Sequence, residues 1–326
     1  MTVIACSLIR AIKWSSITTA KKRKKLLSKM ITFVYRGGGR DTVPRDATHV
    51  IIHESVKAIS ARAFKEHPNI VEVYCHAGVK KIERAAFNRC LRLKKVIMPG
   101  VEAVECGGFC YCQAIEYVEC GKLEQIGSYA FLGCDSLSSI DLQSAKVIGR
   151  SAFDDCDAMT EAKFGANLKS VDEGAFRDCK SLERVLIPLK NGLIRHDDIF
   201  QGCENFRRID LMEAEMLDQT IAALHLEEWR NDMTAEVSSI NQTLLNTFSG
   251  YYNEEEDEEV MGEMTIVIRD WIYRVLSKIR RYRAQHHHLL NKAATALQFA
   301  APNDIVVDNV IPFLELPPHT FDGEED

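Results

Sequence analysis

A repeat of 22 to 24 residues runs through the middle of the chain, and no other feature restricts the fold as strongly. One phenylalanine marks each repeat, at Phe64, Phe87, Phe109, Phe131, Phe153, Phe176 and Phe200. A cysteine follows three residues later in every repeat from the second onward, at Cys90, Cys112, Cys134, Cys156, Cys179 and Cys203, and His67 takes this place in the first. One repeat of this length cannot bury its own apolar side, so we expect the repeats to stack as coils.

Two apolar patterns divide each repeat. Nine and eleven residues after the phenylalanine, apolar side chains alternate with polar ones, which is typical of a strand buried on one face. Around the phenylalanine the apolar residues have a helical spacing. We therefore expect an α/β solenoid of about seven coils over residues 48–212, with parallel strands and short helices. Val50–Ile52 match the strand positions ahead of the first repeat, so the sheet should begin there.

The pattern Ile-Gly-x-x-Ala-Phe-x-x-Cys-x-x-Leu-x-x-Ile-x-Leu, read from Ile126 to Leu142, resembles the repeat of the BspA-like leucine-rich repeat family. The resemblance covers about half of the chain. It implies a parallel-stranded solenoid used for adhesion or protein–protein contact, and it implies no catalytic residue. Some algal members also resemble this chain further along, where they carry a helical tail joined by an acidic linker.

Solenoids of this kind bind partners on the face lined by their strands. If the apolar positions nine and eleven residues after each phenylalanine point inward, positions eight and ten point outward, because side chains alternate along a strand. The predicted partner-binding residues are Glu72, Tyr74, Lys95, Ile97, Tyr117, Glu119, Asp141, Lys163, Arg184, Leu186, Arg208 and Asp210. Tyrosine and arginine are typical interface anchors, which favours Tyr74, Tyr117 and Arg184. The alternative is an ordinary solvated face. Because the face is not strongly basic, we expect a protein partner and no nucleic acid.

The remaining candidates for chemistry do not form a recognisable active site. The recurring cysteines are explained by packing, since cysteine is a small and readily buried side chain. Cys106 and Cys110 lie outside that pattern and stay open as a metal or oxidation site. The side chains of His286-His287-His288 point about 100° apart on a helix, so three of them cannot meet at one ion. The sequence therefore predicts no catalytic residue, no cofactor and no metal.

Residues 1–47 are predicted to be a basic, unstructured lead-in. Residues 1–49 contain eleven Lys and Arg against two acids. The apolar stretch Thr2–Ile12 precedes the basic cluster Lys21–Lys25, which is the reverse of a secretory signal, and no apolar run is long enough to span a membrane. We therefore expect a cytoplasmic or nuclear protein with reduced thiols. The cluster is a candidate nuclear-import signal, an organellar transit peptide or a solvated tail, and Met30 is a candidate internal start.

The repeat stops after Met212, and two helical stripes follow. The first runs from Trp229 to Leu244, and the second, from Ile268 to Leu297, predicts a helix of about 35 residues. The acidic run Glu254–Glu259 predicts a linker near residues 249–263. Residues 213–300 should therefore form an antiparallel helical hairpin that buries both tryptophans, Trp229 and Trp271. It would either cap the solenoid or allow self-association.

Residues 301–326 are expected to form a short helix and an unstructured tail. Asn303–Leu316 vaguely resemble the opening of an F-box but are too short for one. Taken together, the sequence predicts a non-enzymatic interaction scaffold. The alternative is an adaptor that delivers clients to an enzyme complex such as a ubiquitin ligase.

Overall fold

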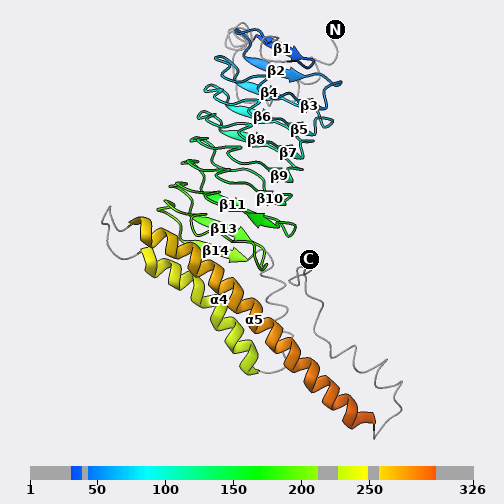
Figure 1. The fold of residues 1–326 in the computed structure, drawn as a ribbon, viewed down its shortest axis with the longest axis vertical. Coiled ribbons are helices and arrows are strands. Elements are labelled where there is room, and N and C mark those ends of the chain that lie inside the picture. The colour runs from blue at the N-terminus through cyan, green and yellow to red at the C-terminus, as the bar shows by residue number, and fades with distance from the viewer. Residues whose placement is uncertain (1–30, 39–42, 212–226, 249–256, 299–326) are drawn as a thin grey trace, which may run out of the picture.

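The computed structural model describes residues 31–38, 43–211, 227–248 and 257–298. The described residues up to Leu211 wind into a stack of coils, and two long helices follow at its end (Figure 1). Neighbouring strands of the described sheets run parallel to each other. The predicted parallel-stranded solenoid with a helical C-terminal part is therefore confirmed.

The longer strands lie on one side of the stack and form two separate sheets. The N-terminal sheet has the order β1-β2-β4-β6-β8, and the C-terminal sheet has the order β11-β13-β14. The bounds are β1 Thr32–Tyr35, β2 His49–Ile52, β4 Glu72–Tyr74, β6 Lys95–Ile97, β8 Tyr117–Glu119, β11 Glu161–Lys163, β13 Arg184–Ile187 and β14 Arg208–Leu211. The central residues Val73, Val96 and Val118 are buried, whereas the residues on either side of them are not. The predicted alternation is thus confirmed.

A further sheet of two-residue strands lies on another side of the coils, in the order β12-β10-β9-β7-β5-β3 (Figure 1). Its strands are β3 Ala58–Ile59, β5 Lys81–Ile82, β7 Ala103–Val104, β9 Gln125–Ile126, β10 Val147–Ile148 and β12 Ser170–Val171. The coils approach closely beside it: a Cβ added to Gly149 would lie 2.7 Å from the backbone nitrogen of Ser128. This sheet was not predicted from the sequence, because two residues are too few to show an alternating pattern.

The seven repeat phenylalanines form one buried column. Each ring is at most 2% exposed, and the centroids of consecutive rings are 4.8 to 6.0 Å apart. Tyr35 of β1 extends the column, with its ring centroid 4.9 Å from that of Phe64. This column is the shared core that the repeat predicts, and it links every coil to the next.

The segment around each phenylalanine is a run of tight turns, so the expected short helix is wrong. Residues two positions before and after the ring have positive φ in most coils, as at Arg62 (60°) and Glu66 (56°) in the first. An α-helix does not contain such residues. The amides of Arg62, Phe64 and Glu66 instead donate to carbonyl oxygens of the next coil, at 2.7 to 3.0 Å. A run of three-residue turns, like a helix, returns a side chain to the core about every third residue. The apolar spacing therefore could not distinguish a run of turns from a short helix.

The recurring cysteines are buried and hydrogen-bonded. The thiol of Cys90 donates to the carbonyl oxygen of Phe64 in the preceding coil at 3.0 Å. The later cysteines of the pattern make the same bond at 3.0 to 3.3 Å. In the first coil, His67 Nε2 lies 2.9 Å from the carbonyl oxygen of Pro44. The position thus requires a compact side chain that can donate, which extends the packing explanation.

The helices α4 (Glu227–Phe248) and α5 (Asp257–Gln298) form the predicted antiparallel pair. Trp229 near the start of α4 stacks on Tyr282 of α5 at 5.2 Å, while the indole of Trp271, earlier in α5, donates to the carbonyl oxygen of Glu236 at 2.9 Å. Residue numbers therefore rise along one helix as they fall along the other. Both tryptophans are buried, as predicted.

The helix pair lies against the last coil of the solenoid. The amide of Ile209 in β14 donates to Asn241 Oδ1 of α4 at 3.3 Å. Arg269 of α5 forms an ion pair with Asp197 of the solenoid. A terminal coil needs its apolar end covered, and α4 and α5 provide this cover.

Two boundaries differ from the expected ones. β1 lies inside residues 1–47, and its offset from β2 is 17 residues, so the repeat period does not reveal it. α5 begins at Asp257 and includes part of the expected acidic linker, because acids are favourable in the first turn of a helix. The basic cluster Lys21–Lys25, the rest of the expected linker before residue 257, and residues 301–326 lie outside the described residues.

Candidate partner-binding surface

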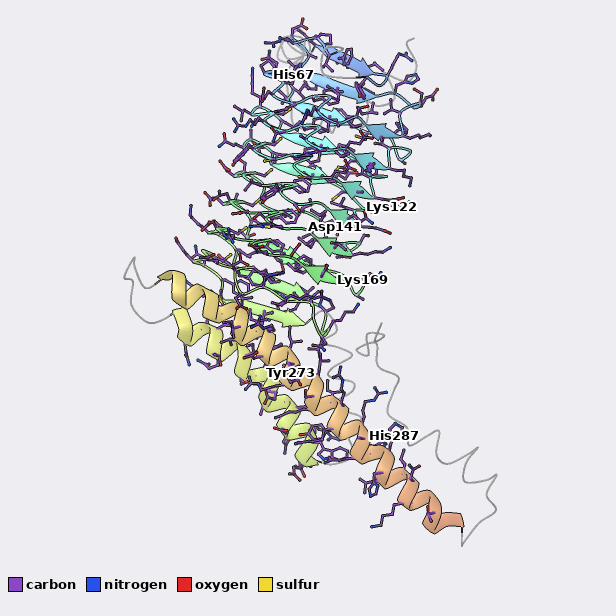
Figure 2. The ribbon with its side chains drawn as sticks, viewed as in Figure 1. His67, Lys122, Asp141, Lys169, Tyr273 and His287 are labelled. Carbon is purple, nitrogen blue, oxygen red and sulfur yellow. The ribbon has the colours of Figure 1, made fainter. Side chains whose placement is uncertain are left out.

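The twelve predicted partner-binding residues all lie on the strand-lined side, and none of them is buried. In the N-terminal sheet they belong to two columns that run across the strands in register. The first column holds Thr32, His49, Glu72, Lys95 and Tyr117, and the second holds Val34, Ile51, Tyr74, Ile97 and Glu119. Side chains project from the coils along this whole side of the stack (Figure 2).

The second column is apolar over four consecutive strands. Val34, Ile51, Tyr74 and Ile97 stand side by side on the outward face and are here called the apolar stripe. Val34, on the edge strand β1, is 42% exposed, and the other three are half-buried. Sequence reasoning missed Val34 and Ile51, because both precede the first phenylalanine from which the positions are counted.

Polar contacts hold the two tyrosines of this face in place. The hydroxyl of Tyr74 donates to the carboxylate of Glu72, and burial together with that carboxylate raises the pKa of Tyr74. The ring of Tyr117 is 49% exposed, and the Nζ of Lys95 lies 5.5 Å from its centroid. Side chains fixed in this way lose little conformational entropy when a partner binds.

The coil that contains Asp141 separates the two sheets. Among the described residues, no backbone hydrogen bond joins residues 139–141 to β8, and the pairing resumes at an isolated bridge between Leu142 and Phe164. A surface depression occupies this break (Figure 2 labels Asp141). Its lining residues are Pro99, Tyr117, Val118, Glu119, Cys120, Gly121, Ser139, Ile140 and Asp141.

The outward face of the C-terminal sheet is charged and internally paired. Glu161 lies 2.6 Å from Lys163 and 3.4 Å from Arg184. Asp210 pairs with Arg184 and lies 2.9 Å from the Nε of Arg208. Each charge on this sheet therefore has a partner of opposite sign, and an incoming protein would have to replace these contacts.

Cys110, which lies outside the repeated position, is not activated. Burial raises the pKa of the Cys110 thiol to about 11. A thiol with a raised pKa stays protonated at neutral pH, and the protonated form is neither a nucleophile nor a good metal ligand. Cys106 is partly exposed and has no disulfide partner. In α5, His286 is buried whereas His287 and His288 are exposed, so the three rings point in different directions.

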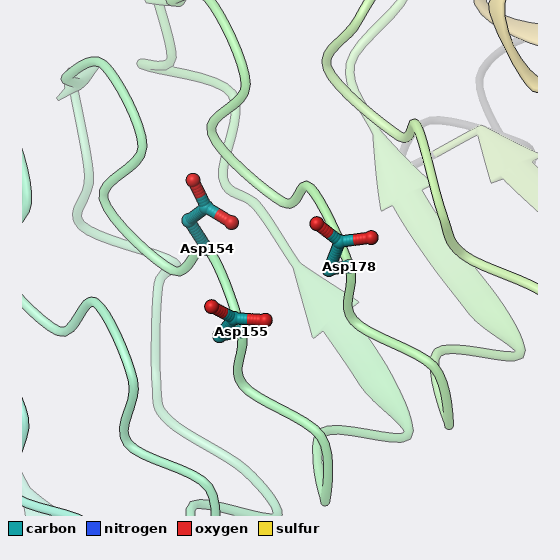
Figure 3. A group of neighbouring side chains, drawn as sticks. All are labelled: Asp154, Asp155 and Asp178. Atoms are coloured by element: carbon teal, nitrogen blue, oxygen red, sulfur yellow. The ribbon is translucent and has the colours of Figure 1, made fainter. Parts of the chain in front are cut away.

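One acidic group on the turn side of the coils was not found from the sequence. The carboxylates of Asp154, Asp155 and Asp178 lie within 4.8 Å of one another (Figure 3). Burial raises the pKa of Asp154 and of Asp178, and the charge of Asp155 adds to both shifts. The sequence does contain a signal for this group, because acidic residues follow closely after the phenylalanine in two consecutive repeats. Crowded carboxylates of this kind are common without a metal, and we assign no site to them.

Comparison with known proteins gives a family match over half of the chain. The family described as "BspA type Leucine rich repeat region" matches residues 45–144 and 80–207 with six copies of its repeat, which together cover residues 45–207. No match was found among functionally curated proteins.

Solved structures of bacterial leucine-rich repeat proteins are similar to this chain at low identity. A protein of T. pallidum has 22% identity and a TM-score of 0.35, with 56% of this chain and 74% of that one covered. A protein of Bacteroides ovatus has 16% identity and a TM-score of 0.34, with 52% and 62% covered. A leucine rich cell surface protein of Faecalibacterium prausnitzii has 16% identity and a TM-score of 0.23, with 52% and 74% covered. Among the described residues, neither helix combines the length and the apolar character that crossing a bilayer requires.

Proposed function

Because this chain belongs to the BspA-type leucine-rich repeat family, we propose that it is a non-enzymatic interaction protein whose partner, another protein, binds the outward face of the N-terminal sheet. The apolar stripe carries this proposal. Protein interfaces are centred on apolar and aromatic anchors with a polar rim, and the stripe with its bordering Glu72, Lys95 and Tyr117 has this composition.

The C-terminal sheet is the less favourable surface for the same partner. Its side chains are charged and paired with each other, and charged residues are depleted in the cores of interfaces. Leu186 is the one apolar residue among its outward positions, and it stands between Lys163 and Asp210 in the register. The proposal thus concerns Tyr74, Ile97 and Tyr117 more than Arg184.

The test compares two matched substitutions in the full-length chain. Ile97→Asp places a charge in the apolar stripe, and Leu186→Asp places the same charge at the equivalent position of the C-terminal sheet. Both residues are half-buried on the outward face, so the two variants should fold alike. Partners are captured from the source cell by cross-linking and identified by mass spectrometry.

We expect Ile97→Asp to lose the partner and Leu186→Asp to keep it. For a partner identified in this way, Tyr117→Ala should weaken binding by roughly tenfold or more while the melting profile stays unchanged. Equal binding by all three variants would contradict the proposed surface. Capture of ligase subunits would favour the adaptor function over a scaffold.

A further inference from the structure

The last two-thirds of α5 carry positive charge without any acid. Residues 271–298 contain six Lys and Arg and three His, and no Asp or Glu. Four of these residues, Arg274, Arg281, His288 and Lys292, recur at intervals of seven, seven and four, which places them along one side of the helix. All four are exposed. We call them the basic strip, and it extends over about 27 Å from first to last.

The neighbouring helix neutralises a different cation. Asp232 and Glu236 of α4 lie 2.6 and 2.9 Å from the Nζ of Lys278, which faces the interior of the helix pair. Among the described residues, neither Arg274 nor Lys292 has an ion-pair partner, whereas Arg281 contacts Tyr282 and its charge also interacts with Asp232 of α4. Arg280, also exposed, adds charge beside the strip. The folded helix pair therefore leaves a concentrated positive charge facing outward.

The basic strip contains no apolar anchor. Ile272, Leu276 and Ile279 of α5 are buried, whereas Tyr273 and Leu289 are exposed beside the strip. A surface helix that binds a membrane needs an exposed apolar face, and a protein interface needs apolar or aromatic residues at its centre. The four strip residues themselves offer a ligand only charge and hydrogen bonds, and the exposed Tyr273 and Leu289 are too far apart on the helix to form one apolar face. Arginine, which supplies two of the four positions, suits phosphate because its guanidinium can donate two parallel hydrogen bonds.

We propose that the basic strip binds the phosphate backbone of a nucleic acid. The charge spacing fits a polymer that repeats its negative charge along its length, and no residue of the strip is placed to read bases. Binding is therefore independent of sequence. This surface is distinct from the strand-lined face, for which charge disfavours nucleic acid, and the proposal does not rest on the protein-binding function.

The test measures the salt dependence of binding. The full-length chain is titrated into a fluorescent duplex of about 24 base pairs, as DNA and as RNA of the same sequence, at several salt concentrations. Neutralising three phosphates gives a slope of about −2.7 in log K against log salt, so raising the salt from about 50 to about 200 mM should weaken binding roughly 40-fold. The difference between the two duplexes shows which nucleic acid is preferred.

Two variants locate the charge. Arg274→Gln with Arg281→Gln and Lys292→Gln should make the slope shallower by about one for each phosphate that is no longer neutralised. The matched control replaces three exposed solenoid cations, Lys57, Lys122 and Lys169, by Gln, and it should bind like the unchanged chain. Circular dichroism verifies that both variants keep their helix content. If the replacement of Arg281 disturbs Tyr282, the double variant Arg274→Gln with Lys292→Gln takes the place of the triple variant in this test.

Several outcomes overturn the proposal. One is no detectable binding at about 50 mM salt, where binding of this type is strongest. Another is equally weakened binding in the control variant, or weakened binding that follows replacement of Lys21–Lys25 instead of the strip. Displacement of the duplex by poly-L-glutamate at matched charge would assign the strip to an acidic protein. Binding to anionic vesicles in preference to the duplex would assign it to a membrane surface.

Discussion

The two sheets on the strand-lined side share the same coil geometry and present different surfaces. In the N-terminal sheet the outward column is apolar from Val34 to Ile97, whereas at the equivalent positions of the C-terminal sheet the column reads Lys163, Leu186 and Asp210. The inward positions are apolar in both. The comparison shows that the stack dictates the inward side chains and leaves the outward ones free to differ from coil to coil.

The largest expected effect comes from the core that the two sheets share. Phe131 lies in the buried column, 5.2 Å from Phe109 and 5.3 Å from Phe153. Phe131→Ala should lower the free energy of unfolding by about 3–5 kcal/mol, because it removes a buried ring and leaves a cavity. Urea unfolding followed by circular dichroism measures this. Phe131→Leu, which fills most of the space, should cost less, and an unchanged midpoint for Phe131→Ala would contradict a shared core.

A smaller effect tests the ion pairs of the C-terminal sheet. Arg184 contacts both Glu161 and Asp210 at the surface. Arg184→Ala should lower the free energy of unfolding by at most about 1 kcal/mol, because exposed ion pairs are screened by water. This destabilisation should shrink at high salt. Lys95→Ala in the N-terminal sheet, where no ion pair is broken, is the control. A destabilisation that is independent of salt would show that packing and not charge distinguishes Arg184.

The smallest effect concerns the crowded carboxylates on the turn side of the same C-terminal coils. Burial and the neighbouring Asp155 raise the pKa of Asp178, so the folded state holds its proton more tightly than the unfolded state does. The contribution of Asp178 to stability is therefore present at low pH and is lost as the pH rises through the folded pKa. Asp178→Asn should stabilise the protein at about pH 7, and the gain should vanish near pH 3.

Asp178→Asn should not strain the backbone, because Asp178 has a φ of 54° and asparagine tolerates this left-handed conformation. Urea midpoints of both proteins across this pH range provide the measurement. A destabilised variant at neutral pH would mean that the carboxylate of Asp178 makes a favourable contact.

Much of the fold follows from the periodic sequence. The spacing of the phenylalanines and of the apolar pairs such as Val96 and Met98 identifies the strand and its buried face, because each coil repeats the same environment. The segment around each ring was assigned the wrong local structure. Most of its left-handed residues, such as Arg62 and Tyr129, are not glycines and gave no sign of their conformation, although glycine takes this place in some coils, as at Gly133. They are held by hydrogen bonds to the next coil, which no single repeat contains.

The candidate surface was predicted only in part, because its positions were counted from the phenylalanine of each repeat. Counting from the phenylalanine places Tyr74, Ile97 and Tyr117 on the outward face, but it cannot reach Val34 or Ile51. The same counting predicts a strand in every coil, so it does not reveal the break between the two sheets at Asp141. That break depends on whether neighbouring coils form a backbone ladder, which involves contacts between residues about 22 apart.

The sequence by itself determined which side chains are buried, because the spacing of apolar residues along the chain identifies the face that is removed from water. It also determined that two amphipathic helices follow the repeats. The tertiary structure alone decided which outward residues stand in one column and which charges are paired, and it leaves Arg274 and Lys292 without an ion-pair partner among the described residues. These properties arise from the register between coils and helices, and register is set by packing over the whole stack.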